Sequence, residues 1–365
     1  MTLDFNRMER LHIAFFGATN SGKSTLVNAI CGQEVSLVSA VPGTTTDPVR
    51  KLAELPGLGP CVLIDTAGLD DTGILGPERE RRTRAVLDET DVAVLLSIPD
   101  LIRDLLAAGI PYVHYTRGES IESLLSRIAA VAPHEEEKYL TGSLVKPGDT
   151  VLLVMPQDSE APKGRLILPQ VQVIRELLDR GCVPHCCTPA SLPAAMASLA
   201  GLPDLVITDS QVFKAVNEAI PAECPLTSFS VLLAGAKGDI RVFVEGARAI
   251  DSLKPGSHVL IAEACTHVPD TEDIGRVKIP ALLRKKIAGQ AGNDGDVLHI
   301  DIAAGNDFPE DLSAYSLIVH CGACVANARV VRSRIRKALL AGVPITNYGI
   351  TLAHLTGILG RISLP

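Results

Sequence analysis

The sequence has few aromatic residues and no excess of positive charge. Tryptophan is absent and aromatic residues make up 3% of the 365 residues, so Leu, Val, Ile and Ala must fill the apolar cores. The formal net charge is −8, which argues against general nucleic-acid binding because that needs a clustered basic surface. No apolar run approaches the ~18 residues of a membrane helix, and the polar N-terminus shows no secretory signal. We therefore expect a cytoplasmic protein that binds neither nucleic acid nor a membrane.

The chain is long enough for two or three domains, and apolar strands alternate with helical patterns along most of it. Such alternation predicts α/β domains with parallel sheets. A charged cluster at 134–138, followed by Gly142 and Pro147, is typical of a linker. The pattern restarts after it, and we expect three α/β domains over residues 9–133, 145–228 and 229–365.

A phosphate-binding loop lies near the N-terminus. Gly17-x-x-x-x-Gly22-Lys23-Ser24 follows an apolar strand and opens a helix, which is the context that this motif requires. Backbone N–H groups and the helix N-terminus would bind phosphates, Lys23 would reach the β and γ phosphates, and Ser24 would ligate Mg²⁺. The loop residues expected to bind nucleotide are Gly17, Asn20, Ser21, Gly22, Lys23, Ser24 and Thr25.

Two further motifs follow in the order of a nucleotide switch. Asp65-Thr66-Ala67-Gly68 ends an apolar strand, so Asp65 can hold the Mg²⁺ shell and Gly68 can offer its N–H to the γ-phosphate. One of Thr44, Thr45 and Thr46, which lie between the two motifs, would complete the Mg²⁺ coordination. Lys23, Asp65 and Gly68 are therefore the expected catalytic residues.

These three motifs resemble the translation-factor-type GTPases, and within them the tRNA-modification and ribosome-assembly branch. The resemblance implies GTP and GDP as ligands, Mg²⁺, and a K⁺ ion near Asn20, which matches an asparagine that holds K⁺ in some members. Leu69 stands where the signalling GTPases have a glutamine that positions water, so we expect slow intrinsic hydrolysis.

The Asn-Lys-x-Asp element that reads guanine is absent from the sequence. It is expected after the strand at 110–115, where residues 116–120 instead lead directly into a helix. Either the base site has degenerated, or the printed sequence omits mobile loops; we favour omission because the flanking strand and helix are intact.

Cysteine and histidine residues gather near the C-terminal end. Cys265-x-His267 and His320-Cys321-x-x-Cys324 each follow an apolar strand, so both groups can converge at one edge of a sheet. Three thiolates suit an iron–sulfur cluster whose fourth iron takes a weaker ligand, although a structural zinc site would use the same residue types. The candidates for the weaker ligand are His267, His320, Asp270 and Glu272.

This cysteine set, joined to such a GTPase domain, resembles the HydF family of [FeFe]-hydrogenase maturation GTPases. Residues 161–170, 274–280 and 344–349 fit the same family, and the likeness covers nearly the whole chain. It implies a P-loop GTPase domain, then a small parallel α/β dimerisation domain, then an α/β iron–sulfur cluster-binding domain. It also implies a [4Fe-4S] cluster on Cys265, Cys321 and Cys324 with an exchangeable fourth site.

The same resemblance implies the partners and the role. A homodimer would carry the diiron subcluster precursor, two radical-SAM maturases would build that precursor, and apo-[FeFe]-hydrogenase would receive it. GTP hydrolysis would regulate partner exchange. Two other hypotheses stay open: an RNA-modification or ribosome-assembly GTPase with a structural zinc site, and a GTPase remnant that acts as a structural adaptor.

Overall fold

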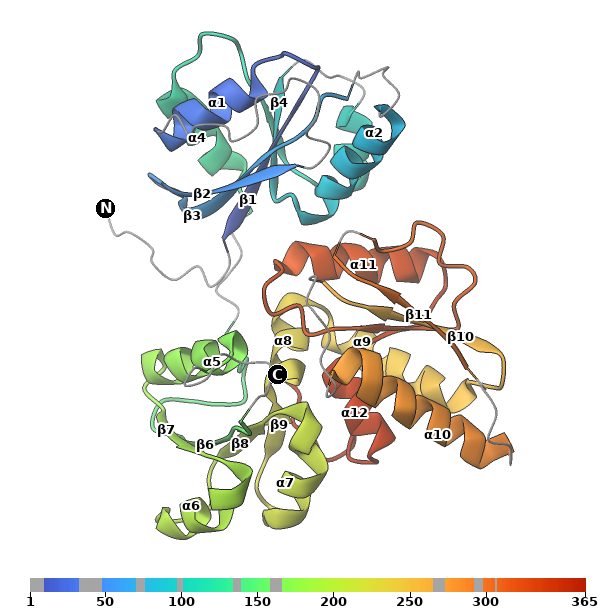
Figure 1. The fold of residues 1–365 in the computed structure, drawn as a ribbon. Coiled ribbons are helices and arrows are strands. Elements are labelled where there is room, and N and C mark those ends of the chain that lie inside the picture. The colour runs from blue at the N-terminus through green and yellow to red at the C-terminus, as the bar shows by residue number, and fades with distance from the viewer. Residues whose placement is uncertain are drawn as a thin grey trace. The chain divides into compact units, whose positions relative to one another are not determined.

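The computed structural model divides into two compact units, Met1–Glu137 and Lys138–Pro365 (Figure 1). The residues that the structure describes are 10–32, 48–69, 76–96, 101–133, 139–157, 166–264, 273–291, 298–305 and 307–365. In this part of the chain, no helix is both long enough and apolar enough to span a bilayer.

The first unit contains a five-stranded sheet in the order β2-β3-β1-β4-β5. Its strands are β1 (Leu11–Gly17), β2 (Val49–Leu55), β3 (Gly59–Asp65), β4 (Val92–Leu96) and β5 (Tyr112–His114). Its helices are α1 (Lys23–Cys31), α2 (Gly76–Ala85), α3 (Leu101–Ala107) and α4 (Ile121–Val131). Apolar residues of α1 and α4 pack on one face of the sheet, and those of α3 pack on the other.

Only β2 departs from the expected parallel arrangement, because it pairs antiparallel with β3. It is an edge strand in which charged residues interrupt the apolar ones and most side chains are exposed or partly exposed, so it lacks the apolar run by which the buried strands can be found in the sequence. The other strands run parallel, which confirms the α/β class and brings their carboxyl ends to one edge.

The second unit contains two four-stranded parallel sheets, in the orders β7-β6-β8-β9 and β11-β10-β12-β13. The strands are β6 (Thr150–Val154), β7 (Val183–Cys187), β8 (Leu205–Thr208), β9 (Leu226–Ser228), β10 (Ser257–Ala262), β11 (Leu298–Ala303), β12 (Leu317–His320) and β13 (Ile345–Asn347). The helices are α5 (Leu168–Asp179), α6 (Leu192–Ser198), α7 (Phe213–Ala219), α8 (Phe229–Lys237), α9 (Ile240–Arg248), α10 (Ile279–Ala291), α11 (Ala328–Leu340) and α12 (Tyr348–Leu355).

Helix α8 joins these two sheets into one body. It contacts α5 and β9 beside the first sheet and α11 and β13 beside the second, and Figure 1 shows it between these elements. One apolar cluster accordingly includes Leu152 and Val206 from the first sheet and Val259 and Ile318 from the second. The two domains expected from the sequence at residues 145–228 and 229–365 share this core, so the boundary between them stays a prediction.

Candidate functional site

The phosphate loop lies between the end of β1 and the start of α1. Gly22 has φ of 94° and Asn20 has φ of 61°, so the loop needs the left-handed backbone that glycine and asparagine adopt most readily. Lys23 is buried, and its Nζ donates to the carbonyl oxygens of Gly17 at 3.0 Å and Ala18 at 2.8 Å. The loop thus holds its own lysine at the point where phosphate oxygens would accept the same hydrogen bonds.

The end of β3 supplies the residues that fit a magnesium ion. Asp65 accepts a hydrogen bond from the Ser24 side chain, and burial raises the pKa of Asp65 despite that bond and the charge of Lys23. Its Oδ1 is buried and has no hydrogen-bond partner in the structure, and the same is true of Ser21 Oγ. Buried oxygens of this kind normally have a partner, and one carboxylate beside one hydroxyl suits Mg²⁺. The residues present therefore fit a nucleotide–magnesium complex.

Gly68 lies against the phosphate loop. A Cβ atom at this position would be 2.2 Å from Thr19 Oγ1 and 2.7 Å from Thr19 N, so only glycine allows the approach. The predicted switch motif therefore reaches the loop that would bind the phosphates. The remaining predicted residues of this site, Thr44, Thr45 and Thr46, lie outside the described residues, and Thr25 is exposed in the first turn of α1.

The turn from β5 to α4 occupies the place of a guanine-reading element. Ser120 caps α4 by accepting the N–H of Ser123 at 3.2 Å. The one carboxylate of the turn, Glu119, accepts from Ser123 Oγ at 2.8 Å and from Arg127 Nη2 at 2.6 Å. Burial by itself would raise the pKa of Glu119, but the hydrogen bonds from Ser123, Arg127 and Thr116 N and the charge of Arg127 together outweigh it, so the pKa is lowered. This carboxylate is engaged within its own turn.

Strands β10 and β12, after which the two cysteine motifs follow in the sequence, lie side by side and end at one edge of the second sheet. Ala262 pairs with His320 in the parallel register, and Cys321 N donates to Ala262 O at 2.9 Å. Beyond the strands, Ala264 N lies 3.1 Å from Cys321 Sγ, and Cys265 is the next residue along the chain. We call residues 262–264 and 320–324 the cysteine edge.

The Cys321 sulfur receives two backbone hydrogen bonds, from Ala264 N and, at 3.4 Å, from Ala323 N. Ala323 adopts φ of 50°, which is unusual for a residue with a side chain, and this turn directs its N–H toward the sulfur. N–H groups directed at a cysteine sulfur favour the thiolate and tune a bound metal. The donor chemistry at Cys321 therefore fits a thiolate-ligated metal centre.

Lys237, the last residue of α8, holds the turn between the two cysteines. It is 6% exposed, and its Nζ donates to the carbonyl oxygens of Ala323 at 2.8 Å, Cys324 at 3.4 Å and Ala326 at 2.7 Å. Burial of an ammonium group costs free energy unless its N–H groups donate hydrogen bonds, as they do here. Nothing in the sequence around Lys237 relates it to the turn between Cys321 and Cys324, so only the structure reveals this contact.

His320 is fully buried and both of its ring nitrogens have protein partners. Nδ1 lies 2.7 Å from Cys321 O and Nε2 lies 3.1 Å from Arg334 Nη1. Burial, followed by the charge of Arg334, lowers the pKa of His320 to about 3, so the ring is neutral at physiological pH. A neutral ring here donates through Nδ1 and accepts through Nε2. The ring therefore orients Cys321, and neither nitrogen faces away from the protein.

Two further charged residues support the cysteine edge. Glu263 is buried and accepts both hydrogen bonds of the Arg276 guanidinium, at 3.0 Å and 2.7 Å. Arg334 is buried as well, and its Nη1 donates to the carbonyl oxygen of Glu263 at 3.0 Å. Only the side-by-side arrangement of β10 and β12 brings these residues together, so sequence spacing could not reveal them.

The rest of the predicted metal set falls in a segment that is not described. Cys265, His267, Asp270 and Glu272 lie in residues 265–272, outside the described ranges. Cys324 is half-buried at the end of the turn that Lys237 holds. Among the described residues, no three Cys, His, Asp or Glu side chains come together as a metal site. The complete ligand set therefore stays a prediction.

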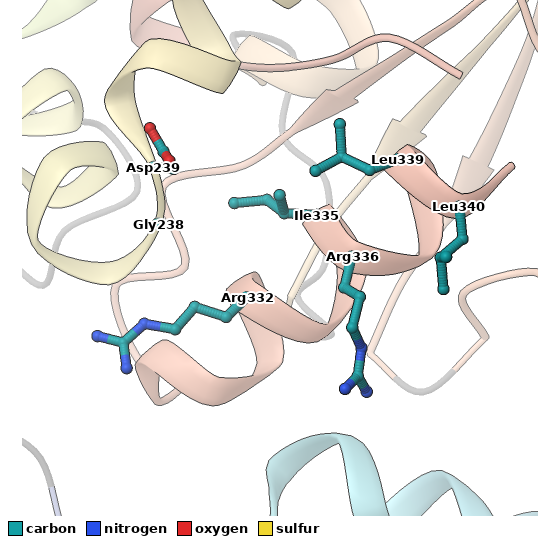
Figure 2. A pocket seen from close by; sticks show the side chains of 7 residues that line it. All are labelled: Gly238, Asp239, Arg332, Ile335, Arg336, Leu339 and Leu340. Atoms are coloured by element: carbon teal, nitrogen blue, oxygen red, sulfur yellow. The ribbon is translucent and has the colours of Figure 1, made fainter. Parts of the chain in front are cut away.

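A separate hollow of about 490 Å³ lies beside α11, and Figure 2 shows its lining. None of the predicted site residues lines it. The exposed side chains of Leu339 and Leu340 lie on this side of the helix. The lining residues are Gly238, Asp239, Arg332, Ile335, Arg336, Leu339 and Leu340.

The first unit is similar to known GTPases. Residues 12–132 match the family model of a 50S ribosome-binding GTPase. The tRNA modification GTPase MnmE of Nitrosospira multiformis is 43% identical over 89 residues, which cover 24% of this chain and 20% of that protein. GTPase Der of Clostridium botulinum is 41% identical over 98 residues, covering 26% and 22%. This chain thus spans about a fifth of the length of these curated relatives.

Among solved structures, Era of Aquifex aeolicus bound to GDP and AlF4− aligns with 82% of this chain and 94% of its own, at 15% identity and a TM-score of 0.25. The family model and the phosphate loop together define the class of the protein. The chain contains a P-loop GTPase domain, as the order of the motifs predicts.

Two further family models match the second unit. Residues 140–238 match the hydrogen maturase F dimerization domain, and residues 241–364 match the hydrogen maturase F tetramerization domain. These models together cover more than half of the chain, and they follow the GTPase domain in the order typical of that family. The chain belongs to the hydrogen maturase F (HydF) family.

Proposed function

We propose that this protein is a GTP-hydrolysing scaffold that carries a [4Fe-4S] cluster and assembles or delivers the diiron subcluster precursor to apo-[FeFe]-hydrogenase. Two radical-SAM maturases would supply the precursor. The HydF-specific domains support the role in hydrogenase maturation, and the cysteine edge supports the cluster. We retain the domain limits 9–133, 145–228 and 229–365 for the GTPase, dimerisation and cluster-binding parts.

One observation carries the cluster proposal. The N–H group of Ala264 donates to the Cys321 sulfur at 3.1 Å, and the next residue is Cys265. The backbone that leads into one predicted ligand is therefore in contact with the sulfur of another, although the two ligands are far apart in the sequence. Cys324 belongs to the same turn as Cys321, since Ala323 N donates to the Cys321 sulfur.

The nucleotide half of the function rests on Lys23, Ser24, Asp65 and Gly68. Lys23 exchanges its carbonyl partners for the β and γ phosphate oxygens, and Ser24 and Asp65 hold the Mg²⁺ shell. The Gly68 N–H reaches the γ-phosphate because the glycine lies against the loop. Asn20 is exposed beside the loop, where a K⁺ ion would offset charge on the phosphates. Leu69 cannot position water, so turnover is slow.

A [4Fe-4S] cluster on Cys265, Cys321 and Cys324 would supply an iron that can take an exchangeable ligand. His320 serves this site as a positioning residue, because its two nitrogens hold Cys321 O and Arg334. His267, Asp270 and Glu272 remain the candidates for the weaker fourth ligand. Lys237 places a positive charge beside the carbonyls of the turn and so offsets the negative charge of the cluster.

The oligomer is part of the proposal. Descriptions of the matched models name dimerisation and tetramerisation, so copies of this chain would assemble through residues 140–238 and 241–364. The exposed Leu339 and Leu340 beside the hollow in Figure 2 lie within the second stretch and are our candidates for a contact between copies. Ordering of the switch residues around GTP would then control when the maturases and the hydrogenase exchange.

Metal analysis of the protein purified without oxygen tests the proposal. We expect brown protein with close to four irons per chain. Colourless protein that holds stoichiometric zinc would contradict it and favour the alternative of an RNA-modification or ribosome-assembly GTPase. One observation favours that alternative, namely the match of the first unit to MnmE and Der. It predicts salt-sensitive RNA binding, which a gel-shift titration would detect, whereas our proposal predicts none.

A further inference from the structure

Strand β11 lies at the outer edge of its sheet, next to β10 (Figure 1). The opposite edge strand, β13, is covered by α9, since a Cβ atom on Gly246 would lie only 2.0 Å from Ile345 O. Among the residues that the structure describes, no strand pairs with the outer side of β11. Such an edge presents a row of backbone N–H and C=O groups to which a further strand can add.

One hydrogen bond shows which backbone groups of β11 face outward. Glu263 N donates to Ala303 O at 2.8 Å, so the carbonyl group of Ala303 faces β10. Successive residues of a strand direct their N–H and C=O groups to alternate sides. The backbone groups of Ile300 and Ile302 therefore face away from β10, toward the open side.

The sequence of β11 does not protect this edge. Edge strands commonly carry lysine or proline, which hinder the addition of another strand, whereas β11 reads Leu-His-Ile-Asp-Ile-Ala. Ile302 is 43% exposed, although isoleucine is among the residues most often buried. Open backbone groups beside an exposed apolar side chain favour the addition of a strand here.

The two polar side chains of β11 are oriented by neighbours within the sheet. His299 and Asp301 are both exposed, and they share one face because alternate residues of a strand do so. The His299 ring stacks on the ring of His258 in β10, with centroids 4.5 Å apart. Asp301 Oδ2 accepts a hydrogen bond from the Tyr315 hydroxyl at 3.1 Å. An N–H donor and a carboxylate are thus held side by side at the open edge.

A two-fold axis makes these two side chains complementary to each other. Two copies of β11 that pair edge to edge about such an axis run antiparallel. With Ile300 opposite Ile300 of the second copy, His299 of each copy lies opposite Asp301 of the other, and Ile302 lies opposite Leu298. Because Ile300 faces outward, His299 and Asp301 form the non-hydrogen-bonded pairs, in which side chains are closest. With Asp301 on the axis instead, two carboxylates would face each other, which is unfavourable.

We propose that β11 pairs antiparallel with β11 of a second copy of this chain, with Ile300 on the two-fold axis and two reciprocal contacts between His299 and Asp301. This inference rests on the proposed oligomer and names one of its contacts, in addition to the one beside the hollow in Figure 2. Residues 241–364, which include β11, match a tetramerization domain, and this match favours another copy of the chain over a different protein.

Exchange of the two side chains tests the pairing. His299→Asp places two carboxylates opposite each other at both contacts, so the dissociation constant of the assembly should rise about tenfold. Asp301→His removes both carboxylates and should weaken the assembly as well. The double variant, His299→Asp with Asp301→His, restores both contacts in exchanged order, so its dissociation constant should return to within about threefold of the wild type. Sedimentation velocity of the full-length proteins over a range of concentrations measures these constants.

Lys214→Gln is the control for these variants. It makes each copy more negative by one unit at an exposed residue of α7, so it should leave the dissociation constant unchanged. An equal rise in Lys214→Gln and His299→Asp overturns the inference, as does a double variant that assembles no better than the single ones. Single variants that assemble like the wild type overturn it too, yet leave the proposed oligomer standing. Wild-type protein that stays a single chain at every concentration overturns both.

Disulfide cross-linking tests the register directly. The Cα atoms of a hydrogen-bonded antiparallel pair are about 5.5 Å apart, a distance that a disulfide spans. Ile300→Cys treated with oxidised glutathione should therefore give a covalent dimer on a non-reducing gel, above the level of the wild type with its nine cysteines.

Ile302→Cys is the matched control for the register. Residue 302 is more exposed than residue 300, but in the proposed register its two copies lie four residues apart along the strand, or about 13 Å. It should not cross-link above the wild type. Equal yields in the two cysteine variants, or no added dimer in Ile300→Cys, overturn the inference.

Discussion

The phosphate loop and the cysteine edge both lie at the carboxyl ends of parallel strands, yet they are held in place differently. The phosphate loop is shaped by its own backbone: Asn20 and Gly22 take positive φ, and Lys23 bonds to carbonyls of the same loop. The cysteine edge is held by side chains from elsewhere, namely Lys237 on α8 and Arg334 on α11. The phosphate loop can thus be disrupted by a substitution within the loop itself. The cysteine edge can also be disrupted by substitutions at residues that are distant in the sequence.

The largest expected effect is a loss of GTP turnover that leaves the cysteine edge unchanged. Lys23→Met removes the cation that would reach the β and γ phosphates, so GTP turnover should fall by about 10²–10³-fold. Iron content should not change, because Lys23 belongs to the first unit, where it donates to Gly17 and Ala18 of its own loop, whereas the cysteine edge belongs to the second unit. Steady-state phosphate release and iron analysis on the same preparation measure both. A parallel loss of iron would show that the two sites are not independent.

A smaller effect should follow from removing the support of the cysteine edge. Lys237→Met leaves carbonyl oxygens of Ala323 and Ala326 buried without their donor, so we expect a loss of about 3 kcal/mol in the free energy of unfolding. Iron binding should weaken while GTP turnover stays normal. Urea denaturation and iron analysis are the measurements.

Lys214→Met is the control for that variant. Lys214 is highly exposed on α7 and makes only a long ion pair with Glu218, at 3.9 Å, so its loss should change stability very little. Equal behaviour of the two lysine variants would show that the buried ammonium does not hold the turn.

The smallest expected effect concerns recognition of the nucleotide's guanine base. The carboxylate of the β5–α4 turn, Glu119, is engaged by Ser123 and Arg127, and the sequence has no Asn-Lys-x-Asp element. Hydrogen bonds from guanine to a carboxylate would contribute about 1.5–3 kcal/mol each. If the base site has degenerated, these bonds are missing and the protein of this sequence should bind GDP and ADP with affinities that differ by less than about tenfold. Isothermal titration with both nucleotides measures this. Preference for GDP above a hundredfold would show that another segment reads the base.

Most of the GTPase part could be predicted from the sequence, because its strands are short apolar runs and its loop residues are contiguous. The strand β4 and the helix α4 lie at the predicted residues. The edge strand β2 was missed, since Arg50, Lys51 and Glu54 interrupt its apolar residues and most of its side chains are at least partly exposed. The convergence of the cysteine motifs stays a prediction, because Cys265 and His267 lie outside the described residues; the register of Ala262 with His320 places the ends of β10 and β12 side by side.

The support of the cysteine edge could not be predicted. Lys237 and Arg334 come from two different helices, and their spacing in the sequence carries no pattern that relates them to Cys321. Sequence alone also left His320 among the candidate ligands, while the structure places Cys321 O and Arg334 at its two nitrogens. Its candidacy as a ligand stays a prediction that the geometry disfavours.

Comparison of wild-type protein with Cys321→Ser tests the central claim most directly. Both proteins would be purified without oxygen, analysed for iron and examined by EPR after reduction, with GTP turnover measured on the same samples. We predict a [4Fe-4S] signal in the wild type, its loss in the variant, and the same rate of GTP hydrolysis in both. An equal iron content and an unchanged signal in Cys321→Ser would contradict the account, because the cysteine edge would then hold no cluster.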